Sequence, residues 1–126
     1  MVDVARQLGR IGNNRGTISE TRVEALCLGI GSEGWPEWLY SGRKATPEED
    51  SKKKDFVFSS DVGDLFVQVK SSQRAAEKFR RTTPYRRGMI EVMVVRSTNS
   101  QEGLQQRLIL KLTNLRDKIL ERRGER

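Results

Sequence analysis

The sequence predicts a small α/β domain in which helices pack on a short mixed sheet. Apolar residues recur at helical spacing within residues 17–30 and 100–122. Between these segments lie short runs that are rich in Val, Phe and Ile, as in strands. Together they give the order α-β-β-β-α-β-α, which is one domain over residues 17–122 of the 126-residue chain.

The first helix and the first strand follow an N-terminal arm. Residues 1–16 are basic and rich in Gly and Asn, so we expect them to be a mobile or loosely docked arm. The helix is expected from Thr17 to about Ile30, with an apolar stripe that includes Val23 and Leu26. Residues 38–41 are expected to form a strand, and the charged residues 42–54 a mobile loop.

The remaining elements follow from turn and capping signals. Residues 55–59 and 64–71 are expected to form a hairpin around a turn at 61–63. A basic helix is expected from a cap at Ser72 to just before Pro84. An apolar strand at 89–96, a helix at 100–122 and a solvated tail at 123–126 complete the chain.

Composition excludes several classes of function. The chain has 24 Lys+Arg against 17 Asp+Glu, a net charge of +7, which favours polyanionic partners, nucleic acid first. It has no histidine, which removes Ser-His-Asp hydrolases and His-ligated zinc enzymes, and Cys27 alone makes neither a disulfide framework nor a cysteine zinc site. Hydrolytic chemistry would therefore rest on carboxylates, Lys and a hard metal ion. No signal peptide or membrane span is visible, so we expect a cytoplasmic protein without a membrane partner.

Four side chains are expected to meet at one end of the predicted hairpin. Asp55 begins one strand, while Gln68 and Lys70 point the same way from its partner strand. Glu20 lies at the edge of the apolar stripe of the first helix and can reach the same place from the side. Such a group fits metal-dependent cleavage of a phosphodiester.

This pattern resembles the PD-(D/E)XK nuclease superfamily, which has the restriction-endonuclease-like fold. That family has an αβββαβ core, a helical Glu, an Asp at the start of the second strand and an acid-x-Lys on the third. The corresponding segments here are "GTISETRVEAL", "KKKDFVF" and "VQVKSS", and the resemblance covers about residues 16–96. Gln68 departs from the family pattern, because most members have Glu or Asp there. The QxK form resembles a branch with small group I intron homing endonucleases, and also Holliday junction resolvase-like proteins.

The resemblance implies a catalytic site of Glu20, Asp55, Gln68 and Lys70. It implies a Mg²⁺ site, which Mn²⁺ can also fill, with Asp55, Gln68, Glu20 and the backbone carbonyl of Val69 as ligands. The Gln68 amide oxygen can ligate a metal but brings no negative charge, so weaker metal affinity or lost activity follows from it. Lys70 is expected to position the attacking water and stabilise transition-state charge.

The acidic residues near the predicted site have structural interpretations or are weaker candidates for it. Thr17-x-x-Glu20 fits a capping box, in which Glu20 reaches back to the N-cap amide. Glu24 is a reserve candidate one turn further on. Asp50 either belongs to the charged loop or approaches the site if the first strand ends near it. Asp61 and Asp64 flank a turn, where Asp is common.

Basic and hydroxyl side chains after Lys70 are expected to hold the substrate backbone, with affinity that falls as salt rises. A solvated helix face is the other interpretation of this segment. The expected nucleic-acid-binding residues are Ser71, Ser72, Arg74, Lys78, Arg81, Arg86 and Arg87.

Three functions remain open at this point. The first is a Mg²⁺-dependent DNA endonuclease that uses no small-molecule cofactor and acts as a homodimer or homotetramer. The second is a catalytically inactive nucleic-acid-binding module of the same fold. The third is a structural subunit whose basic face docks an acidic protein.

Overall fold

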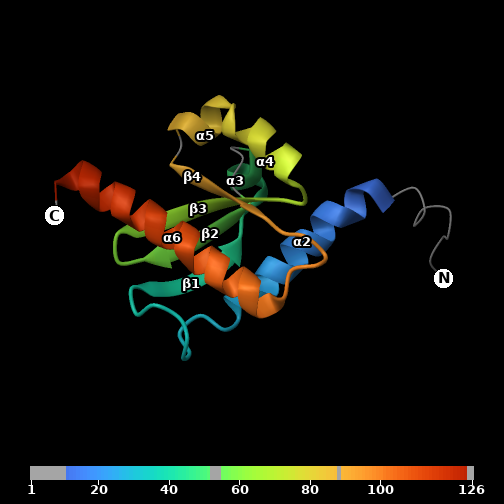
Figure 1. The fold of residues 1–126 in the computed structure, drawn as a ribbon. Coiled ribbons are helices and arrows are strands. Elements are labelled where there is room, and N and C mark those ends of the chain that lie inside the picture. The colour runs from blue at the N-terminus through green and yellow to red at the C-terminus, as the bar shows by residue number, and fades with distance from the viewer. Residues whose placement is uncertain (1–10, 52–54, 88, 125–126) are drawn as a thin grey trace.

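A four-stranded mixed sheet lies at the centre of the protein, in the order β1-β2-β3-β4 (Figure 1). The structure is a computed structural model that describes residues 11–51, 55–87 and 89–124. β1 (Leu39–Lys44), β2 (Phe56–Ser60) and β3 (Gly63–Lys70) are antiparallel neighbours, and β4 (Ile90–Val94) runs parallel to β3. The predicted α/β class, the hairpin and the C-terminal helix are confirmed.

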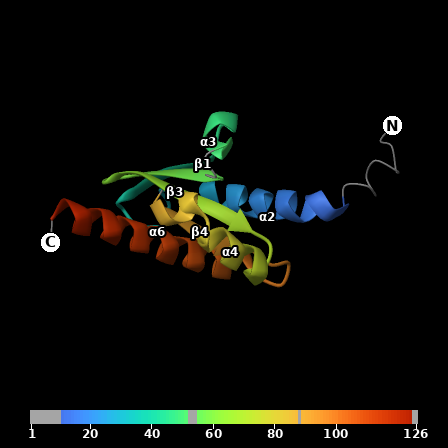
Figure 2. The same ribbon diagram turned by 90° about the horizontal axis from the view of Figure 1, so that it is seen from above.

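Helices cover both faces of this sheet (Figures 1 and 2). α2 (Ile11–Cys27) and α6 (Gln101–Arg123) pack in the larger core with Phe56, Phe58 and the odd-numbered residues of β3. α4 (Gln73–Arg80) and α5 (Thr83–Arg87) pack in a second core with Phe66 and the even-numbered residues of β4. Because side chains alternate along a strand, Gln68 and Lys70 lie on the face that carries α4.

The predicted helix cap at Ser72 forms as expected, and the structure adds a second cap at Ser100. The Ser72 hydroxyl accepts a hydrogen bond from Ala75 N–H at 3.1 Å and begins α4. At the start of α6, Ser100 caps Gly103 N–H at 3.0 Å, and Gly124 ends the helix in the left-handed conformation. The leucine stripe of α6 is buried in the larger core, at Leu104, Leu108, Leu112 and Leu115.

The predicted start of the first helix is wrong. α2 already begins at Ile11, so residues 11–16 of the expected arm are helical, while residues 1–10 lie outside the described residues. Each glycine in a helix costs about 1 kcal/mol relative to alanine. Propagation from a turn that is already packed costs far less than nucleation, and the buried turn at Val23 and Leu26 supplies such a start.

The predicted loop at 42–54 is also wrong in part. β1 continues to Lys44, and residues 47–51 form a short helix, α3 (Pro47–Ser51), which stands apart from the sheet layers in Figure 2. Residues 52–54 lie outside the described residues. The basic helix ends before Pro84 as expected, at Arg80, and Pro84 falls in the first turn of a separate helix, α5, where its missing N–H costs nothing. In the described ranges, no helix combines the length and apolar character needed to cross a bilayer.

Candidate functional site

Asp55 extends the ladder between β2 and β3 with its side chain. It directly precedes β2 and is 7% exposed. Its N–H donates to Val67 O at 3.1 Å, and its carbonyl accepts from Ala45 N–H at 2.8 Å. Its carboxylate Oδ2 accepts a hydrogen bond from Val69 N–H at 2.8 Å. The side chain thus takes the place of the backbone carbonyl that this N–H would bond if β2 continued. This geometry fixes the carboxyl group at the end of the β2–β3 pair.

The environment of Asp55 disfavours its charge. Burial raises the pKa of Asp55 from 3.8 to about 6, although the bond from Val69 N–H lowers it. The pKa of Asp55 is raised further by the negative charge of Glu20. It is also raised by the Asp50 carboxyl, through hydrogen bonding and through its charge. Two acids therefore act on Asp55 at this edge. A cation bound by Asp55 would offset the cost of its ionised form.

Gln68 lies beside Asp55 on the neighbouring strand. Phe56 pairs with Val67, and Gln68 follows on β3 between Val67 and Val69, the two residues whose backbone groups bond Asp55. Gln68 is 7% exposed, and its Oε1 is the buried side-chain oxygen without a hydrogen-bond partner in the described parts of the chain. A buried side-chain acceptor normally has a hydrogen-bond partner, so this oxygen is an exception that calls for a ligand.

Lys70 projects from the same face of β3 as Gln68, two residues further on. Its Nζ lies 5.4 Å from the centre of the Phe79 ring of α4, and this contact orients the side chain. The carbonyl of Val69 faces the β2 side of β3, because the N–H and C=O of a strand residue point the same way and Val69 N–H reaches Asp55. Both groups therefore lie at the end of the strand pair that Asp55 occupies.

Glu20 reaches the site from α2 but is partly engaged elsewhere. Its Oε2 lies 3.7 Å from Lys44 Nζ at the end of β1. The capping-box interpretation of Glu20 is wrong, because α2 already runs through residues 11–16 and Thr17 is therefore not an N-cap residue. Glu24 is exposed one turn further along α2.

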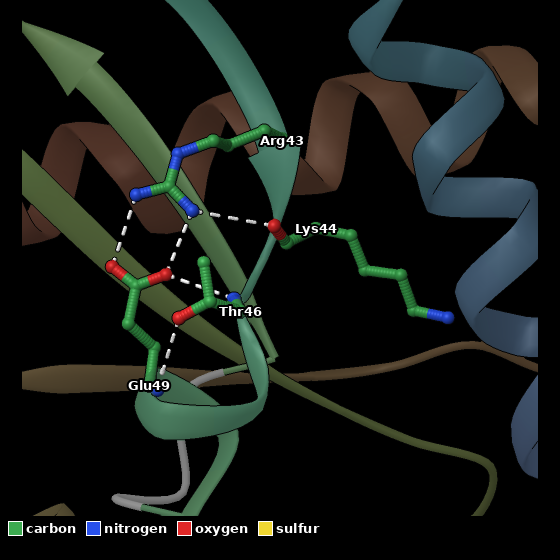
Figure 3. Close-up of polar contacts among 4 residues, drawn as sticks. All are labelled: Arg43, Lys44, Thr46 and Glu49. Carbon is green, nitrogen blue, oxygen red and sulfur yellow. Dashed lines mark hydrogen bonds and ion pairs between the residues drawn. The ribbon is translucent and has the colours of Figure 1, made fainter.

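A rigid clamp joins α3 to β1, and the predictions from sequence missed it. The Arg43 guanidinium forms two hydrogen bonds with the Glu49 carboxylate, of 2.7 and 3.0 Å (Figure 3). Thr46 and Glu49 form a reciprocal capping box, since Thr46 N–H donates to Glu49 and Glu49 N–H donates to the Thr46 hydroxyl. Hydrogen bonds from Arg43 lower the pKa of Glu49 to about 2. The signal was the stretch "TPEE", a capping box with Pro at the first helical position.

The donor set of this edge fits Mg²⁺ in its chemistry. Hard cations take oxygen ligands, and this edge carries carboxylate, amide and backbone carbonyl oxygens on Asp55, Gln68 and Val69. The unpartnered Oε1 of Gln68 is the observation that favours this fit. In the described ranges, no three His, Cys, Asp or Glu side chains are grouped closely enough to hold a metal ion by themselves. A metal here therefore depends on the Gln68 amide as well as on acids.

The predicted nucleic-acid-binding residues lie beyond the end of β3. Arg74 and Lys78 are exposed on α4, Arg81 is exposed at its C-cap, and Arg86 is exposed on α5. Ser72 is committed to the cap of α4. Arg87 belongs to α5, and its side chain lies outside the described ones.

Ser71 lines a pocket of about 490 Å³ next to the site. Arg22 also lines it, but its guanidinium donates to Gln101 Oε1 and to the carbonyls of Arg96 and Asn99, so it holds the wall in place. The other lining residues supply mainly hydroxyl, guanidinium and small apolar groups. They are Ile18, Ser19, Val95, Arg96, Ser97 and Thr98.

No protein-family model matches this chain, and the searches of curated proteins and of solved structures return no match either.

Proposed function

We propose that this protein is a Mg²⁺-dependent DNA endonuclease with a restriction-endonuclease-like core. The observation that carries the proposal is the buried, unpartnered Gln68 Oε1 beside the desolvated Asp55 carboxyl, with Lys70 on the same face. A group of this composition costs stability in the absence of a cation and a phosphate. Oxygen ligands next to a fixed lysine are the parts that metal-assisted phosphodiester hydrolysis needs.

The arrangement of elements supports the same proposal. A helix, three antiparallel strands, a helical crossover and a fourth strand parallel to the third agree with the αβββαβ order of the PD-(D/E)XK family. Asp55 stands at the start of the second strand, and Gln68 and Lys70 lie on the third. The order of elements and the positions of the site residues both support the proposal.

The residues that would hold Mg²⁺ are Asp55, Gln68 and the carbonyl of Val69, with Glu20 at the rim. The ion would supply a bound water of lowered pKa and would offset negative charge on the phosphate. Asp55 keeps its orientation through the bond from Val69 N–H. Gln68 contributes an oxygen without charge, so the site depends more on its remaining acids than an acid-x-Lys site does.

Lys70 acts as a fixed cation beside the scissile phosphate. Its contact with the Phe79 ring limits the positions of its ammonium group. From there it orients the attacking water by a hydrogen bond and stabilises the charge that builds on the phosphate oxygens. A preorganised donor in this role contributes about a hundredfold or more to the rate.

DNA would lie across the α4 side of the site. The exposed basic residues Arg74, Lys78 and Arg81 present one row of charge to a phosphate backbone. Arg86 and Arg87 continue it in sequence. The Ser71 pocket lies beside the strand end, and its hydroxyls and Arg96 suit a phosphate next to the scissile one.

A cleavage assay tests the function directly. Supercoiled plasmid and a four-way junction are incubated with the wild-type protein in Mg²⁺ or Mn²⁺, beside Lys70→Ala and Asp55→Ala. We expect metal-dependent cleavage that both variants lose by at least about a hundredfold, with folding intact by circular dichroism. Lys118→Ala, an exposed lysine of α6, is the matched control and should cleave at the wild-type rate. Cleavage by Lys70→Ala at that same rate would refute the site.

The inactive DNA-binding module is the alternative that one observation favours. Gln68 supplies no charge, and no three-acid metal group forms among the described residues. The absence of cleavage of both substrates, with a salt-sensitive gel shift retained, would select it. Loss of DNA association at moderate salt would select the docking subunit instead.

Two copies of the chain would place two sites on the two strands of a duplex. Leu110, which is 58% exposed on α6, supports an interface on that helix. Sedimentation of the wild type beside Leu110→Glu measures this, and a monomeric wild type would exclude the dimer.

A further inference from the structure

We propose that Asp50, carried by α3, is the second carboxylate ligand of the metal site and replaces the negative charge that Gln68 lacks. This inference rests on the proposed function, because it concerns the same metal. Under this proposal the side-chain ligands of the metal are Asp50, Asp55 and Gln68, and Glu20 is not a ligand.

The backbone brings α3 to Asp55 by a short and well-fixed path. β1 ends at Lys44, and the N–H of the next residue, Ala45, bonds Asp55 O at 2.8 Å. The chain then turns at Thr46, whose carbonyl accepts from Asp50 N–H at 2.8 Å. Asp50 is thus one helical turn from a residue that adjoins the site, and its carboxyl is near enough to Asp55 to raise the pKa of the Asp55 carboxyl.

The clamp of Arg43, Thr46 and Glu49 gives α3 a defined place. A five-residue helix is not stable alone in water, so its position depends on such contacts. The two-pronged bond from Arg43 fastens the helix to β1, and the capping box fixes its first turn (Figure 3). Because Asp50 directly follows Glu49, the clamp holds it beside Asp55.

Charge explains why a second carboxylate belongs here. A divalent cation bound by Asp55 and an amide oxygen would meet one negative charge from these two ligands. Asp50 brings the second, and the buried Gln68 Oε1 gives the third oxygen. The contact between the Asp50 and Asp55 carboxyls is unfavourable when both are ionised, and a shared cation turns it into a favourable one.

Glu20 is less suited to this role. Its carboxylate is ion-paired with Lys44, whose side chain points away from the clamp and toward α2 in Figure 3. Ligation by Glu20 would have to give up that pair, while Asp50 has no ion pair among the described residues. We therefore expect Glu20 to influence the metal through its charge, which also raises the pKa of Asp55, and not as a ligand.

The experiment measures metal binding itself. Mn²⁺ is titrated into the full chain without DNA, and free Mn²⁺ is followed by electron paramagnetic resonance. We expect Asp50→Asn to weaken Mn²⁺ binding by at least about tenfold. Glu20→Gln should weaken it by less than about threefold, because the Glu20 carboxylate stays paired with Lys44 and acts through its charge alone. Glu48→Gln removes one charge from the exposed first turn of the same helix and serves as the control.

A relocated charge provides the decisive variant. Gln68→Glu restores an acid on β3, so the double variant Asp50→Asn/Gln68→Glu should regain Mn²⁺ affinity to within about threefold of the wild type, as complementary changes at coupled sites do. A residue that only supports the fold would give no such rescue. Thermal unfolding without metal is the second readout: loss of Asp50 should leave the melting temperature unchanged or raise it, because a like-charge contact disappears.

The outcomes separate this inference from the proposed function. If Asp50→Asn binds Mn²⁺ as the wild type does while Asp55→Ala does not, the metal site stands and the role of Asp50 is refuted. If Glu20→Gln has the larger effect, the helical Glu is the ligand and the inference fails. If the wild type binds no Mn²⁺, the inference and the metal-dependent function both fail.

Discussion

Asp55→Asn should make the protein more stable at neutral pH while it abolishes cleavage. The carboxyl has a pKa of about 6 in the folded chain against 3.8 in its ordinary state. Between these values the folded state binds more protons than the unfolded state, so stability falls as pH rises through this window and stays low above it. A difference of about two pKa units, at about 1.4 kcal/mol each, makes the ionised carboxylate cost on the order of 3 kcal/mol.

Asparagine removes this cost and keeps the local geometry. Its amide oxygen can accept from Val69 N–H as the carboxylate does, and its NH₂ group can donate to a neighbouring acceptor. Urea unfolding followed by the fluorescence of Trp35 and Trp38 measures the effect, since both rings pack against the larger core. We expect a difference near zero at pH 3.5 and, at pH 7.5, a variant that is on the order of 3 kcal/mol more stable.

Asp64→Asn, an exposed carboxyl on β3, is the control and should show no such dependence on pH. A variant at position 55 that is less stable than the wild type at pH 7.5 would refute the reasoning. It would mean that the carboxylate is mainly a structural cap for Val69 N–H, with the cost of desolvation already offset in the folded protein.

Two further predictions concern packing and DNA binding. Gly42→Ala should destabilise the fold by about 1–3 kcal/mol in urea unfolding, because a Cβ there would lie 2.6 Å from the Phe58 ring; a loss under 0.5 kcal/mol would show that the ring moves aside. Replacement of Arg74, Lys78 and Arg81 together by Gln should reduce the slope of log binding constant against log salt by up to about three, as measured by fluorescence anisotropy with duplex DNA; an unchanged slope would place the DNA elsewhere.

The fold was largely predictable because its elements have local signals. Alternation in residues 55–70 predicts the hairpin, the leucine period predicts α6, and Ser72 and Ser100 mark helix starts. The approach of Asp55 to residues 67–69 of β3 also follows from the length of that hairpin. Where several local signals agree, tertiary contacts do not change the secondary structure that they predict.

The remainder depended on contacts that are remote in sequence or on small energy differences. Glycine content argued against the first turns of α2, but a packed helix extends at small cost. α3 depends on a clamp whose parts lie in β1 and in the helix itself, so a charged stretch that resembles a loop becomes ordered. The capping motif at Thr46 was visible, but nothing local indicated that Arg43 would reach Glu49 or that Asp50 would meet Asp55.

The energetic cost of this edge is itself an argument for function. A buried acceptor without a partner costs about 1–3 kcal/mol, and the ionised Asp55 costs on the order of 3 kcal/mol. Domains of this size are stable by only about 5–15 kcal/mol, so these two terms are large. Leucine at position 68 and asparagine at position 55 would remove both penalties within the same backbone. A ligand that binds only the folded state raises stability with the logarithm of its concentration above its dissociation constant, and a cation held by Asp50, Asp55 and Gln68 would satisfy the acceptor and the acids together.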